Sequence, residues 1–211
     1  MVVETTLTSF IDDLASAAPV PGGGGAAPIV GALSGALAEM DANLTSGKKR
    51  YAEVQPEIDE ILKTTAKLRQ EFVELADADA VAFLPVSKAY GMPRTTEEEI
   101  QKRDEVMQKG LEGAVVPPLR TMELCLEILK IQKRLAEIGS RLAVSDAGVG
   151  SEFARAALRS SSLNVYVNTR LMKDRKKAEE LNRKADEYVE AGAALADETY
   201  KTVSAALAYK G

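Results

Sequence analysis

Apolar positions recur every three or four residues along almost the whole chain, which is the spacing of one face of an α-helix. The pattern predicts a short helix over residues 7–14, one over roughly 26–45 and one from Pro56 that ends at Gly91. A fourth helix follows Thr96 and ends at Pro117, and a fifth runs from there to Gly139. The last two begin near Ser145 and at Asp174, with seams that continue to Leu171 and Thr199. No window shows the sustained alternation of apolar and polar residues that a strand requires. We therefore expect an all-α fold: a single domain, residues 1–211, built as an up-and-down bundle of about seven helices.

The segment that begins at Pro56 carries the clearest helical seam. The positions of this seam are spaced by three and four residues, and all are apolar except Thr65 and Asp79. They are Ile58, Ile61, Thr65, Leu68, Phe72, Leu75, Asp79, Ala82 and Val86. A carboxylate on such a seam must be paired, bound to a metal, or protonated with a raised pKa. Asp79 is therefore a candidate acid or base, with a structural salt bridge as the alternative, whereas Asp77 points to a different face.

Pro21 and four glycines, residues 22–25, precede the helix predicted over residues 26–45. Ala27, Gly31 and Gly35 in this helix are spaced by four, so another helix can approach closely along that stripe. Because the segment is almost entirely Ala, Gly and Leu, we predict it to be the central and most buried helix.

The glycine run itself is a candidate ligand site. Backbone amides of Gly22, Gly23 and Gly24 can approach an anion or a flat ring, and the positive end of a helix adds attraction. The alternative is a flexible turn. The run is no P-loop, since no Gly-Lys-Ser/Thr follows at the required spacing, and no dinucleotide fingerprint, since no strand precedes it.

Three further groups of polar residues have two possible roles each. Lys48, in a basic run after Gly47, either stabilises a helix end or holds an anionic substrate. Asn164 and Asn168, one turn apart, either bridge helices or hydrogen-bond a polar heterocycle. Ser145 and Asp146 are also candidate ligand residues, with capping of the following helix as the alternative.

Composition narrows the class of protein. A chain of 211 residues with 45% hydrophobic residues can bury a substantial core. The formal net charge is -5, and the sequence lacks the clustered positive residues of a nucleic-acid binder. No stretch reaches the ~18 apolar residues of a membrane span. The single cysteine, Cys125, lies in an apolar run, so we expect it to be buried in a protein of the reducing cytoplasm.

The chain contains no histidine. With a single cysteine, this leaves no ordinary zinc site, and we expect no metal. Proton transfer would have to use Asp, Glu, Lys or Tyr.

Five segments, in order, resemble one known family. Residues 21–25 are similar to its Pro-Gly-Gly-Gly-Ser stretch, 43–51 to Asn-Leu-Thr-x-Gly-Lys-Lys-x-Tyr, and 77–83 to Asp-x-Asp-Ala-x-Ala-Phe. Residues 145–146 match its Ser-Asp pair, and 164–168 its Asn-Val-x-x-Asn. The sequence thereby resembles the cyclodeaminase/cyclohydrolase family, found as separate bacterial proteins and as the C-terminal domain of formiminotransferase-cyclodeaminase. Gly25 replaces a usual Ser and Ser140 a common Asn.

The resemblance implies a homodimeric helical bundle with a folate site near the glycine run and the first Asp-rich segment. It implies an enzyme that converts 5-formiminotetrahydrofolate to 5,10-methenyltetrahydrofolate and ammonia. Asp79 is then the expected acid and base, with Asp77 as the second choice. The expected ligand-binding residues are Gly22, Gly23, Gly24, Lys48, Ser145, Asp146, Asn164 and Asn168. The tetrahydrofolate derivative is the substrate, and no tightly bound cofactor is expected.

Three alternatives remain open. The first is a methenyltetrahydrofolate cyclohydrolase, in which the same carboxylate activates water. The second is a non-catalytic folate binder or a helical partner of a separate formiminotransferase. The third is a purely structural oligomerisation module.

Overall fold

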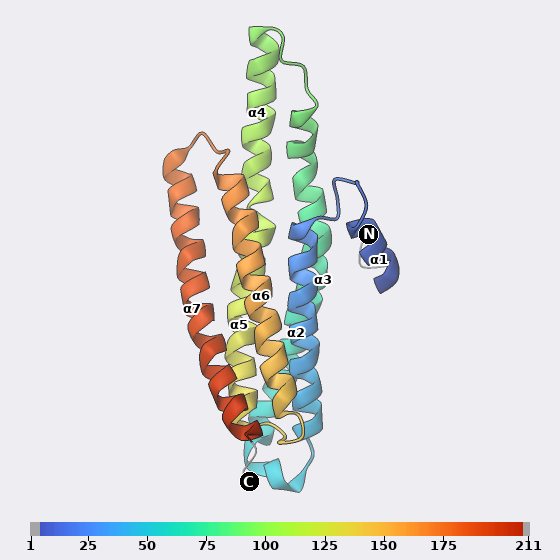
Figure 1. The fold of residues 1–211 in the computed structure, drawn as a ribbon, viewed down its shortest axis with the longest axis vertical. Coiled ribbons are helices and arrows are strands. Elements are labelled where there is room, and N and C mark those ends of the chain that lie inside the picture. The colour runs from blue at the N-terminus through green and yellow to red at the C-terminus, as the bar shows by residue number, and fades with distance from the viewer. Residues whose placement is uncertain (1–4, 209–211) are drawn as a thin grey trace.

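The computed structural model describes residues 5–208, and all regular structure in that range is helical. The elements are α1 (Leu7–Leu14), α2 (Gly23–Thr45), the short 3₁₀ helix η2 (Lys49–Val54), α3 (Gln55–Tyr90), α4 (Glu97–Ala114), α5 (Val116–Ile138), α6 (Val144–Thr169) and α7 (Arg175–Leu207). Figure 1 shows α2 to α7 running along the long axis of the molecule, with α1 beside the upper part of α2 and α3. The predicted all-α bundle is confirmed.

Helices α2 and α5 are buried to the same extent, with 11 buried residues of 23 in each, so α2 is a central helix as predicted but is no more buried than α5. Helix α5 packs against α2, α3, α6 and α7 and carries much of the apolar core, including Met122, Leu124, Ile128 and Leu129. By contrast, Leu33 on α2 is 50% exposed. The mostly apolar composition of α2 suggested burial on all sides, but in one chain one side of this helix faces outward.

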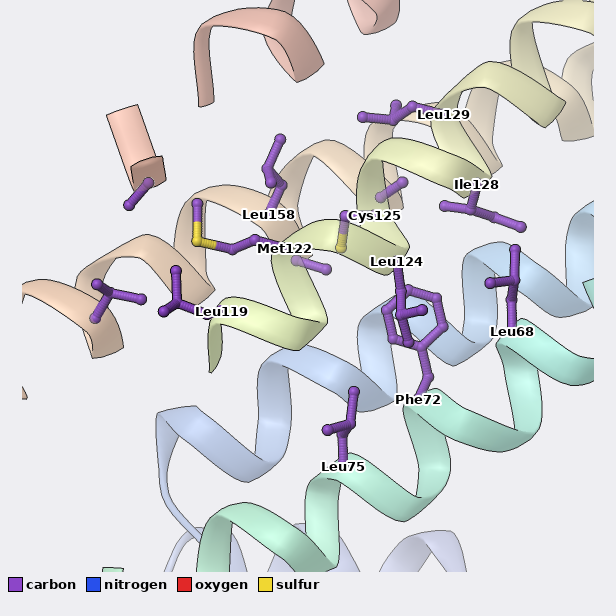
Figure 2. Packing of buried hydrophobic residues seen from close by; sticks show 14 of the residues in the cluster. Leu68, Phe72, Leu75, Leu119, Met122, Leu124, Cys125, Ile128, Leu129 and Leu158 are labelled. Carbon is purple, nitrogen blue, oxygen red and sulfur yellow. The ribbon is translucent and has the colours of Figure 1, made fainter. Parts of the chain in front are cut away.

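Helices α2 and α3 approach each other closely along the predicted small-residue stripe. A Cβ atom at Gly31 would lie 2.5 Å from the Phe72 ring, and one at Gly35 would lie 3.2 Å from the Arg69 side chain. Figure 2 shows the Phe72 ring pointing from α3 toward α2, with Leu124 approaching from α5. The glycines therefore bring the backbone of α2 within reach of side chains on α3.

Helices α2 and α6 begin at slightly different residues from those expected from the sequence. The four-glycine run does not precede α2 as a loop, because Gly23 to Gly25 already form the first turn. Helix α6 begins at Val144 with Ala143 as its N-cap and no side-chain cap. Ser145 and Asp146 therefore lie inside its first turn, and the alternative that they cap it is wrong.

Two features foreseen from composition can be compared with the structure. Cys125 is fully buried, as predicted, and burial raises the pKa of its thiol. None of the helices within residues 5–208 has the length and apolar character needed to cross a membrane.

The close approach of α2 and α3 can be tested by unfolding. Gly31→Ala would push a methyl group into the Phe72 ring, and overpacking of this kind costs about 1–3 kcal/mol. Gly113→Ala is the matched control, because a Cβ there meets nothing within 4 Å and alanine favours a helix. Urea unfolding should show Gly31→Ala clearly destabilised and Gly113→Ala unchanged or slightly stabilised; equal stabilities would contradict the contact.

Candidate functional site

The first turn of α2 lies directly against the carboxylate of Asp79. A Cβ atom at Gly24 would stand 2.3 Å from Asp79 Oδ1 and 2.4 Å from Oδ2. No side chain larger than hydrogen fits at Gly24 without displacing the carboxylate. The glycine run and the seam carboxylate, singled out separately in the sequence, thus form one site where α2 begins beside α3.

Asn164 on α6 borders the same turn. A Cβ at Gly23 would lie 3.8 Å from Asn164 Oδ1, so the amide stands beside the glycine backbone with space between them. Its Nδ2 donates to the carbonyl of Ser160 at 3.0 Å, and this nitrogen lies 3.9 Å from the same Cβ position. Asp79 and Asn164 therefore border the start of α2 from two different helices.

Asn168, one turn further along α6, has a structural use. Its Nδ2 donates to the carbonyl of Ala114 at 3.1 Å and to that of Asn164 at 2.9 Å. The first bond joins α6 to the end of α4. The side chain thereby bridges helices, which is one of the two roles expected for it, and it supports the turn that carries Asn164.

The environment of Asp79 favours its protonated form. The side chain is half-buried, and burial raises its pKa to about 6, from an ordinary value of 3.8. Among the described residues, no cation or hydrogen bond offsets that effect. A carboxyl group that titrates near neutral pH can accept a proton in one step and return it in the next. Asp77, two residues away on α3, is half-buried as well.

A second polar cluster lies at the other end of α2, centred on Asp41. This side chain is fully buried, and its Oδ1 accepts from the Ser140 backbone amide at 3.2 Å and from Thr45 Oγ1 at 3.3 Å. Its Oδ2 is buried without a hydrogen-bond partner. Burial raises the pKa of Asp41 to about 6, and the negative charge of Asp146 adds to the shift.

Basic side chains lie on the surface of the molecule around the buried Asp41. Lys48, Lys49, Arg50 and Arg141 are all exposed there. A cavity of about 560 Å³ opens between η2, the loop before α6 and the end of α7; its lining includes Arg50, Tyr51, Gly139 and Arg141. Sequence patterns had not singled out Asp41. Its position one turn before Thr45 on a helix otherwise nearly free of charge was the available signal.

The structure divides the predicted site residues between two places. Gly22, Gly23, Gly24, Asp79 and Asn164 gather at the start of α2, whereas Lys48, Ser145 and Asp146 belong to its far end. Helix α2 has 23 residues. At about 1.5 Å per residue, its two ends stand roughly 30 Å apart.

Comparisons with known proteins agree with one another. The sequence profile of the family described as formiminotransferase-cyclodeaminase matches residues 6–187. The chain is 40% identical to a methenyltetrahydrofolate cyclohydrolase of Methylorubrum extorquens, over 96% of this chain and 98% of that protein. It is 28% identical to the mouse formimidoyltransferase-cyclodeaminase over 82% of this chain, which spans only 32% of the mouse protein.

A solved structure shows the same architecture. The crystal structure of formiminotetrahydrofolate cyclodeaminase from Thermotoga maritima superimposes with a TM-score of 0.81 at 30% identity, covering 98% of each chain. The likeness therefore extends over the whole bundle, including the helices that carry both polar clusters.

The burial of Asp79 makes a prediction about stability. Its folded pKa of about 6 exceeds the ordinary 3.8, so ionisation costs folding free energy in full above pH 6, and that cost declines as the pH falls from 6 toward 3.8. Asp79→Asn removes the charge in a similar volume. Thermal unfolding at pH 8 should show a melting temperature roughly 2–6 °C above wild type.

The gain from Asp79→Asn should shrink at pH 5, where the wild-type carboxyl is mostly protonated. A melting temperature at pH 8 equal to or below that of wild type would show that the ionised carboxylate carries no such cost.

Proposed function

Because the chain belongs to the formiminotransferase-cyclodeaminase family, we propose that it is a folate one-carbon enzyme, and specifically a methenyltetrahydrofolate cyclohydrolase. The relative with that name matches over nearly the full length of both chains. The observation that carries the proposal is the half-buried Asp79 carboxylate, held against Gly24 at the start of α2, because it supplies a base that titrates near neutral pH.

The substrate of this reaction is a cation. In 5,10-methenyltetrahydrofolate a single carbon bridges N5 and N10, and the positive charge is shared between the two nitrogens. An ionised Asp79 stabilises that charge electrostatically. Above pH 6 the carboxylate is mostly ionised, so it is ready to accept a proton from water.

Ring opening then takes three proton transfers, two of them through Asp79. Asp79 removes one proton from water as the oxygen attacks the bridging carbon, and N5 becomes neutral in the resulting carbinolamine. Protonated Asp79 returns that proton to N5 as the bond from carbon to N5 breaks. The hydroxyl proton passes to solvent as the carbonyl forms, which leaves 10-formyltetrahydrofolate and one released proton.

The remaining residues of the site serve binding. The backbone of Gly22 to Gly24 lets a flat ring approach the start of α2 without side-chain obstruction. The Asn164 amide offers both a donor and an acceptor to the edge of a pterin. Asp77 is the second candidate for proton transfer, but Asp79 is the carboxylate that faces the glycine turn.

A second candidate is the cyclodeaminase reaction, and the similarity to the Thermotoga maritima cyclodeaminase favours it. Here N10 of 5-formiminotetrahydrofolate attacks the formimino carbon, and Asp79 carries the N10 proton to the departing ammonia. The same carboxylate suits both reactions, since each needs one proton accepted and one returned beside a cationic carbon. This reaction would make a separate formiminotransferase the natural source of substrate.

The proposal includes a homodimer that works in the cytoplasm. Neither reaction requires a tightly bound cofactor, because the transferred carbon arrives on tetrahydrofolate itself.

Substitution of the carboxylate tests the chemistry. Asp79→Asn should lower kcat/KM for 5,10-methenyltetrahydrofolate by about 10²–10⁴-fold, the usual contribution of a positioned general base. The decay of methenyl absorbance, corrected for the rate in buffer, measures it. Wild-type kcat/KM should fall as the pH drops through about 6, because the base becomes protonated.

Asp41→Asn is the matched control for the pH profile, since Asp41 also titrates at about 6 but lies at the far end of α2. This variant should keep the acid limb of the profile. A wild-type rate for Asp79→Asn would remove Asp79 from the mechanism.

The glycine contact gives an independent test. Gly24→Ala should lower kcat/KM at least about tenfold, because the new methyl group displaces the carboxylate and small misplacements of a catalytic group are costly. Gly113→Ala is the control, since a Cβ there meets nothing within 4 Å and the residue is exposed on α4, outside the predicted site. If the two variants had equal rates, the position of Asp79 against Gly24 would be irrelevant to catalysis.

A further inference from the structure

Phe83 lies on the same face of α3 as Asp79, one turn further along the helix. Phe72 and Phe83 are eleven residues apart, which is about three helical turns, so their side chains leave α3 in nearly the same direction. The Phe72 ring points toward α2 (Figure 2), where a Cβ at Gly31 would lie 2.5 Å from it. Phe83 is therefore directed toward the side of α3 that α2 covers at Phe72.

The register between α2 and α3 places Phe83 beyond the start of α2. The contacts of Gly24 with Asp79 and of Gly31 with Phe72 lie seven residues apart on both helices, so the antiparallel register is constant between them. Continued by one turn, the same register sets Phe83 opposite a position three residues before the first residue of α2. Figure 1 shows α3 continuing past the start of α2, where the chain turns away toward α1.

The burial of the two phenylalanines differs accordingly. Phe72 is fully buried, whereas Phe83 is half-buried, with part of its ring packed against the apolar core. Phe83 stands about 6 Å beyond Asp79 along the axis of α3, since four residues separate them and each rises about 1.5 Å. A planar ring beside the Asp79 carboxylate at the first turn of α2 therefore reaches the accessible part of Phe83.

A carboxylate and an aromatic ring at neighbouring turns suit a planar cation. Asp79 supplies a negative charge that no cation among the described residues offsets. The face of an aromatic ring attracts a cation that lies within about 6 Å of its centre. In 5,10-methenyltetrahydrofolate the positive charge is spread over N5, the bridging carbon and N10 of a nearly flat five-membered ring. A neutral folate would lose both attractions.

We propose that Phe83 is a specificity-determining residue: its accessible ring surface lies against the methenyl ring of the substrate and favours this cation over neutral folates. The identity of the ligand in this inference rests on the proposed function. The cyclodeaminase reaction would use the same contact, because its product is the same methenyl cation.

A comparison of a cationic and a neutral folate tests the contact. Phe83→Leu keeps an apolar side chain but removes the ring. It should raise KM for 5,10-methenyltetrahydrofolate about 5- to 30-fold, which corresponds to a lost cation–π contact of about 1–2 kcal/mol. The competitive inhibition constant of tetrahydrofolate, which lacks this charge, should change by less than about threefold. Equal weakening of both ligands, or a wild-type KM, would overturn the proposal.

Phe83→Tyr and Leu84→Ala are the matched controls. Phe83→Tyr keeps the ring, so its KM should stay within about twofold of wild type, and a loss as large as that of Phe83→Leu would contradict the role of the ring. Leu84 is 57% exposed and, as the next residue, points to a different side of α3. Leu84→Ala should leave both constants unchanged. Melting temperatures show that each variant is folded.

The chain contains no tryptophan, which allows a measurement without turnover. In Phe83→Trp the introduced indole is the only one, and tetrahydrofolate should change its emission in a saturable manner. Tyr200→Trp is the control, because it places the indole on an exposed part of α7, and its emission should not respond. If tetrahydrofolate still inhibited Phe83→Trp but left its emission unchanged, the contact would be refuted.

The outcomes separate this inference from the proposed function. A wild-type protein that turns over neither 5,10-methenyltetrahydrofolate nor 5-formiminotetrahydrofolate would refute the proposed function, whereas a saturable response of Phe83→Trp would still place Phe83 at a folate site. Normal turnover by wild type together with an unchanged KM for Phe83→Leu would refute the role of Phe83 alone.

Discussion

The close packing of α2 against α3 is the constraint on which the rest of the molecule depends. Glycines at two successive turns of α2 let the Phe72 ring and the Arg69 side chain reach its backbone. The same approach continues to the first turn, where Gly24 leaves just enough space for the Asp79 carboxylate. One physical device, the absence of side chains along one stripe of a helix, thus secures the core and positions the candidate base.

That packing also sets the chemistry of the carboxylate. Asp79 is packed against α2, and residues 5–208 place no counter-charge beside it, so burial raises its pKa to about 6 and opposes its ionisation. A structural salt bridge would lower the pKa and leave the group a poor proton carrier. Burial of Asp79 therefore both lowers the stability of the fold and gives the carboxyl group a pKa suited to proton transfer, a combination that is typical of functional sites.

Much of this could be predicted from the sequence, because local spacing determines which residues share a helix face. The seam that contains Asp79 and the close-approach stripe at Gly31 and Gly35 both follow from intervals of three or four residues. The buried cluster at Asp41 did not, because its partners in the loop before α6 lie about a hundred residues away in sequence.

Helix α2 is as buried as the prediction required on one side and open on the other, and composition alone does not show this division. An apolar helix shows that its surface must be covered, but the sequence does not say whether the same chain covers it. In one chain α2 is as buried as α5, yet its outward side stays open between an acidic and a basic end. The division of the ligand residues between those ends likewise depends on the length of α2, which motif spacing alone does not reveal.

The central claim is that this bundle carries out one-carbon chemistry on tetrahydrofolate. The most direct measurement is the methenyl absorbance after wild-type protein is added to 5,10-methenyltetrahydrofolate. The account predicts a loss of absorbance that is proportional to protein concentration and far faster than in buffer. Loss at the buffer rate, together with no gain of methenyl absorbance from 5-formiminotetrahydrofolate, would contradict it.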